Sequence, residues 1–435
     1  MEKLLKIAAS KGCRAEVFST REKSLSMSKV NGAVSDVSAS IESGVSLRIL
    51  KDGKLGFAYT KNLIDREELV ANALASLEAG VEALYDFPDT GSVSFFEDFD
   101  ESVETLSFPE LRKNIDRIEN LYGEMKEGIL QAAAGCGTTE IRIINTSGAD
   151  LLQKESSVYS TGLMIYPGTS SGLRNVFAGK STCEIFEPDV KRTVDNFYNS
   201  LPEVEIGDSR MKVLFPPDVM YALTWRLGVA SSAKAFYEKV SPLLNKIDTQ
   251  VISPLISFIS DPSVGSMGRR VFDDEGVKTG RVPVFENGLF KKVYNNLDYA
   301  SKMNTAPVGT GFRGGMWGGD KVSLSPAPSL SHATFSPGSK SFQEMLEMMD
   351  RGVIVYGALG AHSGNILNGD LSIGLNPGLY VENGKVVGRV KDAMMAGNIY
   401  EMLSKAIAVE KIPHYTGSMF DNPSILLEDI SVVGS

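Results

Sequence analysis

The sequence predicts an α+β protein of two domains, the first an antiparallel sheet with helices and the second mostly β with a few helices. At 435 residues the chain is too long for one ordinary core, and apolar residues make up 43% of it, enough to fill two. In the first half, alternating polar and apolar runs are interspersed with helical periods, whereas the second half is rich in Gly and Pro and has few helical runs.

The N-terminal elements can be placed in order along the chain. Segment 2–12 has the period of a short amphipathic helix, and 15–60 then changes to a period of two. The turn pairs Asn31-Gly32 and Asp52-Gly53 divide this stretch into an antiparallel meander. Further helices are predicted over 62–80, 107–130 and 187–201, and further strands over 138–167 and 172–182.

Residues 202–212 fit neither period, so we predict a boundary near residue 208 between domains 1–208 and 209–435. The second domain opens with an apolar strand over 211–217, ended by two prolines, and continues into a helix over 218–236 with Asp218 as its cap. One face of this helix is apolar at intervals of three and four, at Met220, Leu223, Leu227 and Ala230.

Beyond that helix the sequence predicts mainly strands. One further helix is expected over 341–352. Glu-Asn-Gly occurs at 286–288 and at 382–384 between apolar residues, and both are predicted to be hairpin tips because Asn-Gly readily adopts positive φ.

Charge and composition limit the classes of partner. Lys and Arg number 44 against 54 acidic residues, giving a net charge of −10 and a pI near 5.1, which argues against a nucleic-acid partner. The apolar run at the N-terminus is too short and too interrupted for a signal peptide or a membrane anchor. We therefore expect a cytoplasmic protein with no membrane partner.

Cysteine and histidine are scarce. Cys13, Cys136 and Cys183 contain no C-x-x-C pair, and an odd number is unlike a secreted disulfide framework. A zinc site needs three or four ligands, usually with two at a fixed local spacing, and His332, His362 and His414 show no such spacing. His362 lies in a Gly/Asn-rich loop after an apolar strand, so it is kept, with Ser363 and Arg313, as a candidate for lining a substrate groove.

Asp273, Asp274 and Glu275 are three adjacent acids before a glycine. They could hold a cation or perform acid–base chemistry, or they could be the solvated end of a hairpin. Neighbouring carboxylates on an extended chain point to opposite sides, so we interpret the triplet as a structural turn at the surface.

Two short motifs resemble catalytic signatures but lack their context. "GTGFRG" at 309–314 matches G-x-G-x-x-G, but a helical segment precedes it and a flexible Gly-rich loop is expected after it, so nucleotide binding is not predicted. "GTSSG" at 168–172 matches the nucleophile elbow around Ser170, but it lies between two predicted strands and is interpreted as a β-turn.

A long ordered block of the sequence resembles the TldD/PmbA family, once described as modulators of DNA gyrase. The block comprises "VFDDEGVKTGRVPVFENGLFKKVYNNLDYASKMN", then "GALGAHSGNILNGDLSIGLNPGLYVENGKVVGRV", "AGNIYEML" and a final "PSILLEDISVVG". The order of segments matches from about residue 15 to the C-terminus. "AHSGN" before "GDLS" is more similar to the PmbA (TldE) branch than to TldD.

The resemblance implies a cytosolic metallopeptidase formed by the two branches together. Its TldD-type subunit carries His-Glu-x-x-x-His on the helix after the first strand of the C-terminal domain, with a Cys further on. In this chain the corresponding helix "DVMYALTWRLGVASSAK" has no His, Glu or Cys, and no cysteine follows Cys183. The resemblance therefore implies that this chain has no catalytic or metal-binding residue and that zinc is held only by the partner.

Three hypotheses follow. The first is a non-catalytic partner of a TldD-type zinc peptidase that acts on peptides or unfolded segments and forms a homodimer when alone. The second is a self-sufficient hydrolase that uses His362, the acids at 273–275 or Ser170. The third is a regulator that binds gyrase or DNA, although the acidic charge argues against DNA.

Overall fold

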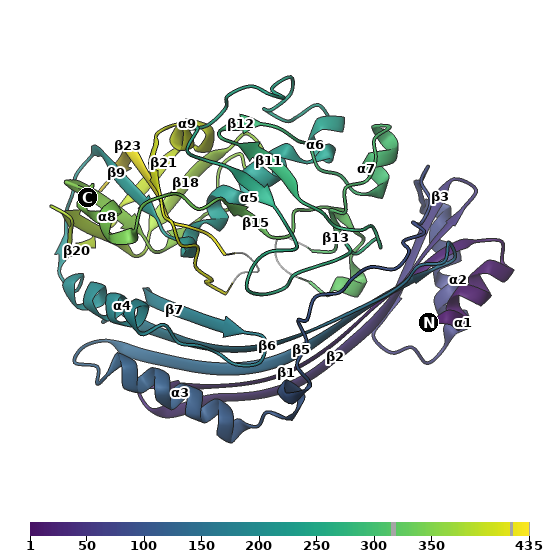
Figure 1. The fold of residues 1–435 in the computed structure, drawn as a ribbon, viewed down its shortest axis with the longest axis horizontal. Coiled ribbons are helices and arrows are strands. Elements are labelled where there is room, and N and C mark those ends of the chain that lie inside the picture. The colour runs from purple at the N-terminus through teal and green to yellow at the C-terminus, as the bar shows by residue number, and fades with distance from the viewer. Residues whose placement is uncertain (315–318, 418–420, 435) are drawn as a thin grey trace.

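The computed structural model describes residues 1–314, 319–417 and 421–434. The predicted α+β class is confirmed. A long curved sheet forms the N-terminal part of the molecule, and a β-rich C-terminal part lies against its concave side (Figure 1). Among the described residues, no helix has the length and apolarity needed to cross a bilayer.

The N-terminal sheet is an antiparallel sheet of seven strands in the order β4-β3-β2-β1-β5-β6-β7. Both predicted turn pairs, Asn31-Gly32 and Asp52-Gly53, have positive φ at each residue, as a type I′ turn requires. The strands are β1 (Arg14–Val30), β2 (Ala33–Lys51), β3 (Lys54–Thr60), β4 (Val81–Glu82), β5 (Ile129–Asn145), β6 (Asp150–Ile165) and β7 (Gly172–Gly179).

Four helices accompany this sheet. α3 packs on β1, β5 and β6 on the convex side, and α4 packs beside β7 (Figure 1). The short 3-10 helices η1 (Leu77–Ala79) and η2 (Glu101–Thr105) lie between them along the chain. The helices are α1 (Glu2–Ser10), α2 (Arg66–Ser76), α3 (Phe108–Tyr122) and α4 (Glu187–Asn199).

The helix predicted over 107–130 was too long. α3 ends at Tyr122 because Gly123 adopts a positive φ of 73°, and β5 begins at Ile129, earlier than the predicted strand. Ala132 and Ala134 favour a helix locally, but in β5 they are buried in the same apolar cluster as Ile115 of α3. Packing against α3 therefore overrides local propensity here.

The C-terminal part contains a 10-stranded sheet, a 4-stranded sheet and a 2-stranded sheet. The large sheet is mixed, since β9 pairs in parallel with β16 and β8 in parallel with β20. Its strands are β8 (Glu203–Val204), β9 (Ser209–Phe215), β16 (Arg351–Val355), β17 (Ala358–Leu359), β18 (Asp370–Leu375), β19 (Gly378–Glu382), β20 (Lys385–Val390), β21 (Met394–Asn398), β22 (Ala406–Val409) and β23 (Ile425–Val433).

The smaller sheets and the helices complete this part. The 4-stranded sheet has the order β12-β11-β10-β15, and β13 pairs with β14. Their strands are β10 (Phe258–Ser260), β11 (Val282–Glu286), β12 (Leu289–Phe290), β13 (Gly311–Phe312), β14 (Ala327–Pro328) and β15 (Ala333–Phe335). The helices are α5 (Tyr221–Ser231), α6 (Ala233–Tyr237), α7 (Leu297–Lys302), α8 (Phe342–Glu347) and α9 (Ile399–Ser404), with the 3-10 helices η3 (Pro217–Val219) and η4 (Lys321–Ser323).

The helix predicted over 218–236 is interrupted. Ser232 is extended, with ψ 144°, and its hydroxyl caps α6 by accepting from the Ala235 N–H, so α5 and α6 are separate helices. The prediction that Asp218 caps the helix was wrong. Among the described residues no side chain caps α5, and the Asp218 carboxylate instead accepts from Arg174 of β7 at 3.2 Å. The cation comes from the other domain, which local sequence does not reveal.

Two other predictions for this part can be compared with the structure. The helix expected over 341–352 is shorter, since α8 ends at Glu347 and β16 begins at Arg351. Both hairpin tips are confirmed: Asn287 and Asn383 have φ values of 48° and 47°, and each is followed by a glycine with positive φ.

The domains share one apolar cluster. It joins Ile115 of α3 and Met164 of β6 to Leu214 of β9, Phe342 of α8 and Ile354 of β16. The N-terminal sheet is therefore packed against the C-terminal part and does not form a separate lobe.

A buried ion-pair network crosses the same boundary. Arg48 of β2 donates two hydrogen bonds to Glu16 of β1, both at 2.9 Å, and one to Glu275 of the C-terminal domain at 2.8 Å. The other Glu275 oxygen accepts from the Leu297 N–H at the start of α7 at 2.7 Å. Arg48, Glu16 and Glu275 are each only 1% exposed, so water cannot replace any of these three charged groups as a partner.

The acidic triplet forms a turn, as predicted, but its expected place at the surface was wrong. All three acids are buried. Asp273 accepts from the backbone N–H groups of Glu275, Val277 and Gly311, and Asp274 accepts from the Arg270 side chain. Strands from the other domain cover the turn, and this long-range contact has no local sequence signal.

Removing the cation of the network tests its role. Arg48→Met leaves the carboxylates of Glu16 and Glu275 buried without their shared partner, so the free energy of unfolding is expected to fall by about 3–5 kcal/mol. Chemical denaturation followed by circular dichroism measures this loss. The control is Arg14→Met, because Arg14 makes an exposed ion pair with Asp86 and its loss is expected to cost less than about 1 kcal/mol. Equal effects of the two substitutions would contradict a structural role for the network.

Candidate functional site

α5 separates the core of the C-terminal domain from an open cleft. Two prolines end β9, and the chain then turns through η3 into α5. The apolar face predicted from the spacing is confirmed, since its four residues are fully buried in the domain core: Met220, Leu223, Leu227 and Ala230.

The opposite face of α5 lines the cleft, which has a volume of about 710 Å³. Tyr221, Thr224, Trp225, Gly228 and Val229 face it from the helix. The other walls come from β13, β14, β15, β17 and the loop that follows β17, contributing Phe312, Gly314, Pro328, Leu330, Ala333, Leu359 and His362, among others. The lining is mainly apolar and aromatic, as in many sites that bind organic ligands.

Arg226 fixes the loop that borders this cleft. It is fully buried within α5, and its guanidinium donates to the carbonyl oxygens of Asp370 at 2.7 Å, Ser363 at 2.8 Å and Ala222 at 2.9 Å. It therefore ties the 363–370 loop to the helix through backbone acceptors. Sequence reasoning missed this residue, although a single arginine among apolar helix positions was an available signal.

The three residues predicted for a substrate groove have different locations. His362 lines the cleft and is exposed, and Ser363 beside it is exposed. Arg313 does not line the cleft, although its neighbours Phe312 and Gly314 do. Its side chain is buried.

Arg313 belongs to the contact between the domains. Its guanidinium donates to the Ser46 hydroxyl at 3.0 Å and the Leu324 carbonyl at 2.6 Å, and it stacks 4.2 Å above the Phe18 ring. Burial, followed by the nearby Arg48 cation, lowers the pKa of Arg313 to about 10. Its place in "GTGFRG" gave no sign of this contact, because Ser46 and Phe18 lie more than 200 residues away in the chain.

The two motif matches lack the required geometry. Ser170 lies in the hairpin between β6 and β7 and not on a strand-to-helix turn, so the β-turn interpretation is confirmed. "GTGFRG" follows the short helix α7 and contains β13, so the phosphate-binding arrangement of strand, loop and helix is not formed. The flexible loop expected after it falls partly on residues 315–318, outside the described residues.

His332 is a structural residue. It is buried, with Nδ1 2.8 Å from the Ser331 hydroxyl and Nε2 2.8 Å from the Met267 carbonyl oxygen. Burial lowers its pKa.

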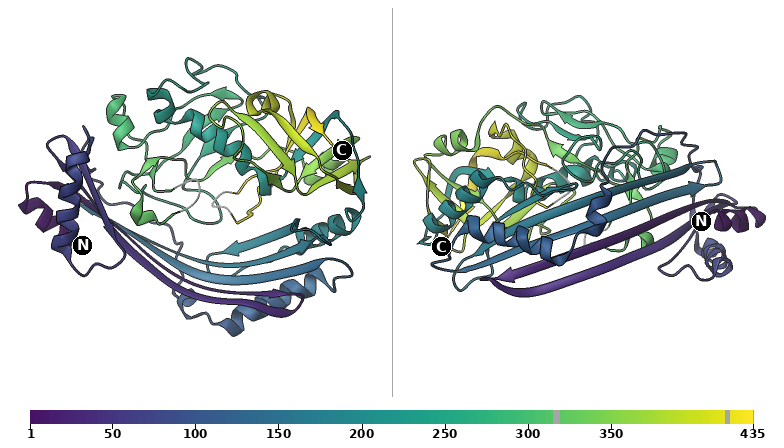
Figure 2. Two further views of the ribbon diagram at one scale, coloured as in Figure 1. Left: turned by 180° about the vertical axis from the view of Figure 1, so that it is seen from behind. Right: turned by 60° about the horizontal axis from the view of Figure 1, so that its bottom comes forward.

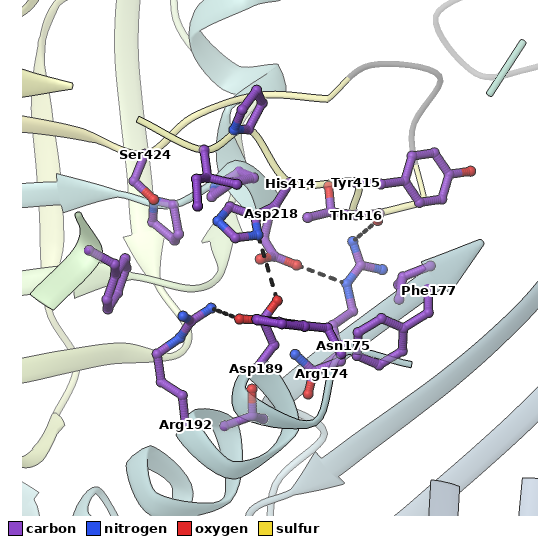
Figure 3. Close-up of a pocket in the computed structure, with 18 of the residues that line it drawn as sticks. Arg174, Asn175, Phe177, Asp189, Arg192, Asp218, His414, Tyr415, Thr416 and Ser424 are labelled. Carbon is purple, nitrogen blue, oxygen red and sulfur yellow. Dashed lines mark hydrogen bonds and ion pairs between the residues drawn. The ribbon is translucent and has the colours of Figure 1, made fainter. Parts of the chain in front are cut away.

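A second cavity, of about 460 Å³, lies where β7 and α4 meet the C-terminal domain (Figure 3). His414 stands at its centre, with Nε2 3.1 Å from Glu410 and Nδ1 3.6 Å from Asp189 of α4. Arg192 of α4 pairs with the same Asp189 at 2.9 Å. Beside them, Arg174 donates to Asp218 and to the Thr416 carbonyl oxygen, both at 3.2 Å.

The charges in this cavity pair with one another across the domain boundary. Burial alone would lower the pKa of His414, but the facing carboxylates of Asp189 and Glu410 raise it to about 9. Burial raises the pKa of Asp218. The protonated imidazole therefore acts as a latch that joins α4 to the segment after β22.

Neither cavity brings together a recognisable metal site. Within residues 1–314, 319–417 and 421–434, no group of three or more His, Cys, Asp or Glu side chains has the arrangement needed to hold a metal ion. The α5 cleft is therefore the candidate site for binding an organic ligand, and the cavity around His414 is a polar contact between domains.

Comparisons with known proteins place this geometry in a family. The model for the PmbA/TldA metallopeptidase C-terminal domain matches residues 208–434, and that for PmbA/TldA metallopeptidase domain 1 matches residues 15–85. The "Metalloprotease PmbA homolog" of Haemophilus influenzae is 24% identical over 99% of this chain and 94% of its own length. An uncharacterised protein of Methanocaldococcus jannaschii is 24% identical over 95% of each chain.

Solved structures share the fold. TldE from Thermococcus kodakarensis superimposes with a TM-score of 0.89 at 23% identity, covering 100% of both chains. A protein from Thermotoga maritima, described as a candidate modulator of a DNA gyrase, gives 0.85 at 24% identity over 99% of both chains.

The His414 latch predicts a dependence of stability on pH. Its pKa rises from an ordinary value of 6.5 to about 9 on folding, so its stabilisation is full below pH 6.5 and is lost as the pH rises through about 9. His414→Gln should therefore lower the melting temperature most at pH 6, and the difference from the wild type should shrink by pH 9. Thermal unfolding across this range measures the difference. His362→Gln serves as the control for the loss of an exposed imidazole, and a His414→Gln effect that is constant with pH would contradict the latch.

Proposed function

The chain belongs to the PmbA/TldD family of metallopeptidase-like proteins. On that premise we propose that it lies in the PmbA/TldE-like branch and is the non-catalytic subunit of a two-component peptidase. A TldD-type subunit would carry the zinc and hydrolyse the peptide bond. This chain would help to enclose that centre and hold part of the substrate. The cytoplasm is the compartment proposed for the complex.

The chemistry of the α5 cleft face carries the proposal. Zinc needs imidazole, thiolate or carboxylate donors. By the resemblance, a TldD-type subunit carries such donors on the helix that corresponds to α5. In this chain the cleft face of α5 presents a phenol, a hydroxyl, an indole and an isopropyl group. These side chains, at Tyr221, Thr224, Trp225 and Val229, do not fit a zinc ion. We therefore assign no hydrolytic step to this chain.

The same side chains suit a peptide. A cleft of about 710 Å³ with aromatic and aliphatic walls can accept apolar side chains of an extended segment. Unfolded polypeptides offer such segments and folded ones bury them, which supports peptides or unfolded segments as the substrate class.

Most of the residues that a self-sufficient hydrolase would use are engaged in structural contacts. Each carboxylate at 273–275 accepts hydrogen bonds from backbone N–H groups or from arginine, and Ser170 lies in a hairpin. Regulation of gyrase has no specific observation in its favour beyond the description of the Thermotoga maritima relative.

Reconstitution tests the proposal. The purified chain, a TldD-type subunit from the same organism, and the two together are assayed on an unfolded protein such as casein, each with and without a zinc chelator. We expect activity to require the zinc-bearing subunit, to increase when this chain is added, and to be lost with the chelator. Cleavage of casein by this chain alone, surviving the chelator, would overturn the proposal.

A charge placed in the cleft tests its role in the complex. Val229→Lys puts an ammonium group among apolar walls and should lower the rate of casein cleavage by about tenfold or more, without preventing assembly with the zinc subunit. Val240→Lys is the matched control, because Val240 is exposed and does not line the cleft. Equal rates for the two variants, with assembly checked by size-exclusion chromatography, would exclude the cleft from substrate binding.

A further inference from the structure

The α5 cleft deepens from an exposed mouth to a buried floor. Tyr221, at the start of α5, is 49% exposed and Leu359 is 58% exposed, so both lie at the mouth. Gly228, Tyr294 and Ala333 also line the cleft but are buried, so they form its floor. Every described lining residue belongs to the C-terminal part, which the view from behind in Figure 2 shows above the concave side of the sheet. The cleft is therefore built without the N-terminal sheet.

Gly228 is an unexpected residue for the middle of a helix. Glycine destabilises a helix interior relative to alanine, because it loses more backbone entropy on folding. One reason to keep it would be a neighbouring element that packs too closely for a side chain. However, a Cβ added at Gly228 would lie 3.9 Å from Leu330 Cδ1 and 4.0 Å from the Tyr294 hydroxyl oxygen, its nearest described neighbours apart from the backbone of its own helix. These are ordinary van der Waals distances, so packing within the chain does not require glycine.

The missing side chain leaves the helix backbone bare at the floor of the cleft. Glycine allows a ligand to approach a backbone closely. Here the Gly228 carbonyl oxygen accepts from the Tyr294 hydroxyl at 2.9 Å and from the Ser231 hydroxyl at 3.1 Å, so both of its lone pairs are used. Because this carbonyl group needs no further hydrogen bond, the floor at Gly228 suits an apolar group.

The walls above this floor favour an uncharged ring. None of the described residues that line the cleft is Asp, Glu, Lys or Arg, and His362 lies at the exposed mouth. A charged side chain would lose its hydration at the floor without gaining a partner. An aromatic ring would bury a large apolar surface and could meet the rings of the lining edge to face. These rings belong to Tyr221, Trp225, Tyr294 and Phe312.

We propose that the cleft holds an aromatic side chain of a peptide, with its ring lying against the backbone of α5 at Gly228. This inference rests on the proposed function and deepens it, because it names the type of residue that the cleft selects. A ring is planar, so it can lie closer to bare backbone than the branched side chains of leucine or valine. Folded proteins bury most of their aromatic rings, whereas unfolded segments expose them.

Binding of short peptides to the full chain alone tests the selection. The probes are pentapeptides of sequence Ser-Gly-X-Gly-Ser, acetylated and amidated at their ends, in which X is Phe, Leu or Lys. Isothermal titration calorimetry measures each Kd. We expect the Phe peptide to bind about fivefold more tightly than the Leu peptide, since contacts between rings add to the buried area. The Lys peptide should show no measurable binding.

Gly228→Ala tests the contact with the helix backbone. The new methyl group fits the free chain but occupies the place of the ring, so the affinity for the Phe peptide should fall by about tenfold or more. The melting temperature should stay the same or rise, because alanine favours a helix, and a folding defect then cannot explain the loss of binding.

Gly280→Ala is the matched control. Gly280 is exposed, does not line the cleft and has no described atom within 4 Å of the position of an added Cβ, so its substitution should leave the affinity unchanged. The inference is overturned if the Phe peptide binds no more tightly than the others, if Gly228→Ala leaves its Kd unchanged, or if no peptide binds. None of these outcomes decides the proposed function, which the casein assay with the zinc-bearing subunit tests separately.

Discussion

The contact between Arg48 and Glu275 holds the two domains in one arrangement. Arg48 belongs to the N-terminal sheet and Glu275 to a turn of the C-terminal domain, and both are buried where water cannot replace either partner. The second oxygen of Glu275 accepts from the first N–H of α7, so the turn, the helix and the sheet are fixed together. The proposed substrate cleft depends on this contact, since β13, one of its walls, is bonded through Gly311 to Asp273 of the same turn.

The residues of α5 that hold the helix in the domain core are different from those that line the cleft. The buried side of α5 fills the C-terminal core, its exposed side lines the cleft, and Arg226 reaches across to the 363–370 loop. A cleft built in this way can keep its shape after the chemistry of its lining has changed. Under the proposed function, this arrangement would let the cleft hold a substrate although its helix presents aromatic and aliphatic groups and no metal donors.

Local signals in the sequence predicted the fold class, the turn pairs and the buried face of α5, because each depends on residues close together in the chain. The errors have a common cause. Asp218 and Arg313 were assigned from their neighbours in sequence, but Asp218 accepts from Arg174 and Arg313 donates to Ser46, both in the other domain. The turn at 273–275 is likewise joined to the other domain, through the contact of Glu275 with Arg48. Of the residues that line the cleft, only His362 was predicted from the sequence to lie in a groove, since the others, mostly apolar or aromatic, form no recognised motif. Which polar groups pair across the two domains could not be predicted from local sequence patterns.

We propose that this chain binds no catalytic zinc. The most direct test of this proposal is the zinc content of the purified chain after incubation with excess zinc and removal of loosely bound ions, measured by mass spectrometry of the metal, beside a TldD-type subunit treated in the same way. We predict one zinc per TldD-type subunit and well below one per copy of this chain. One tightly bound zinc in this chain, retained by its C-terminal domain, would contradict the account.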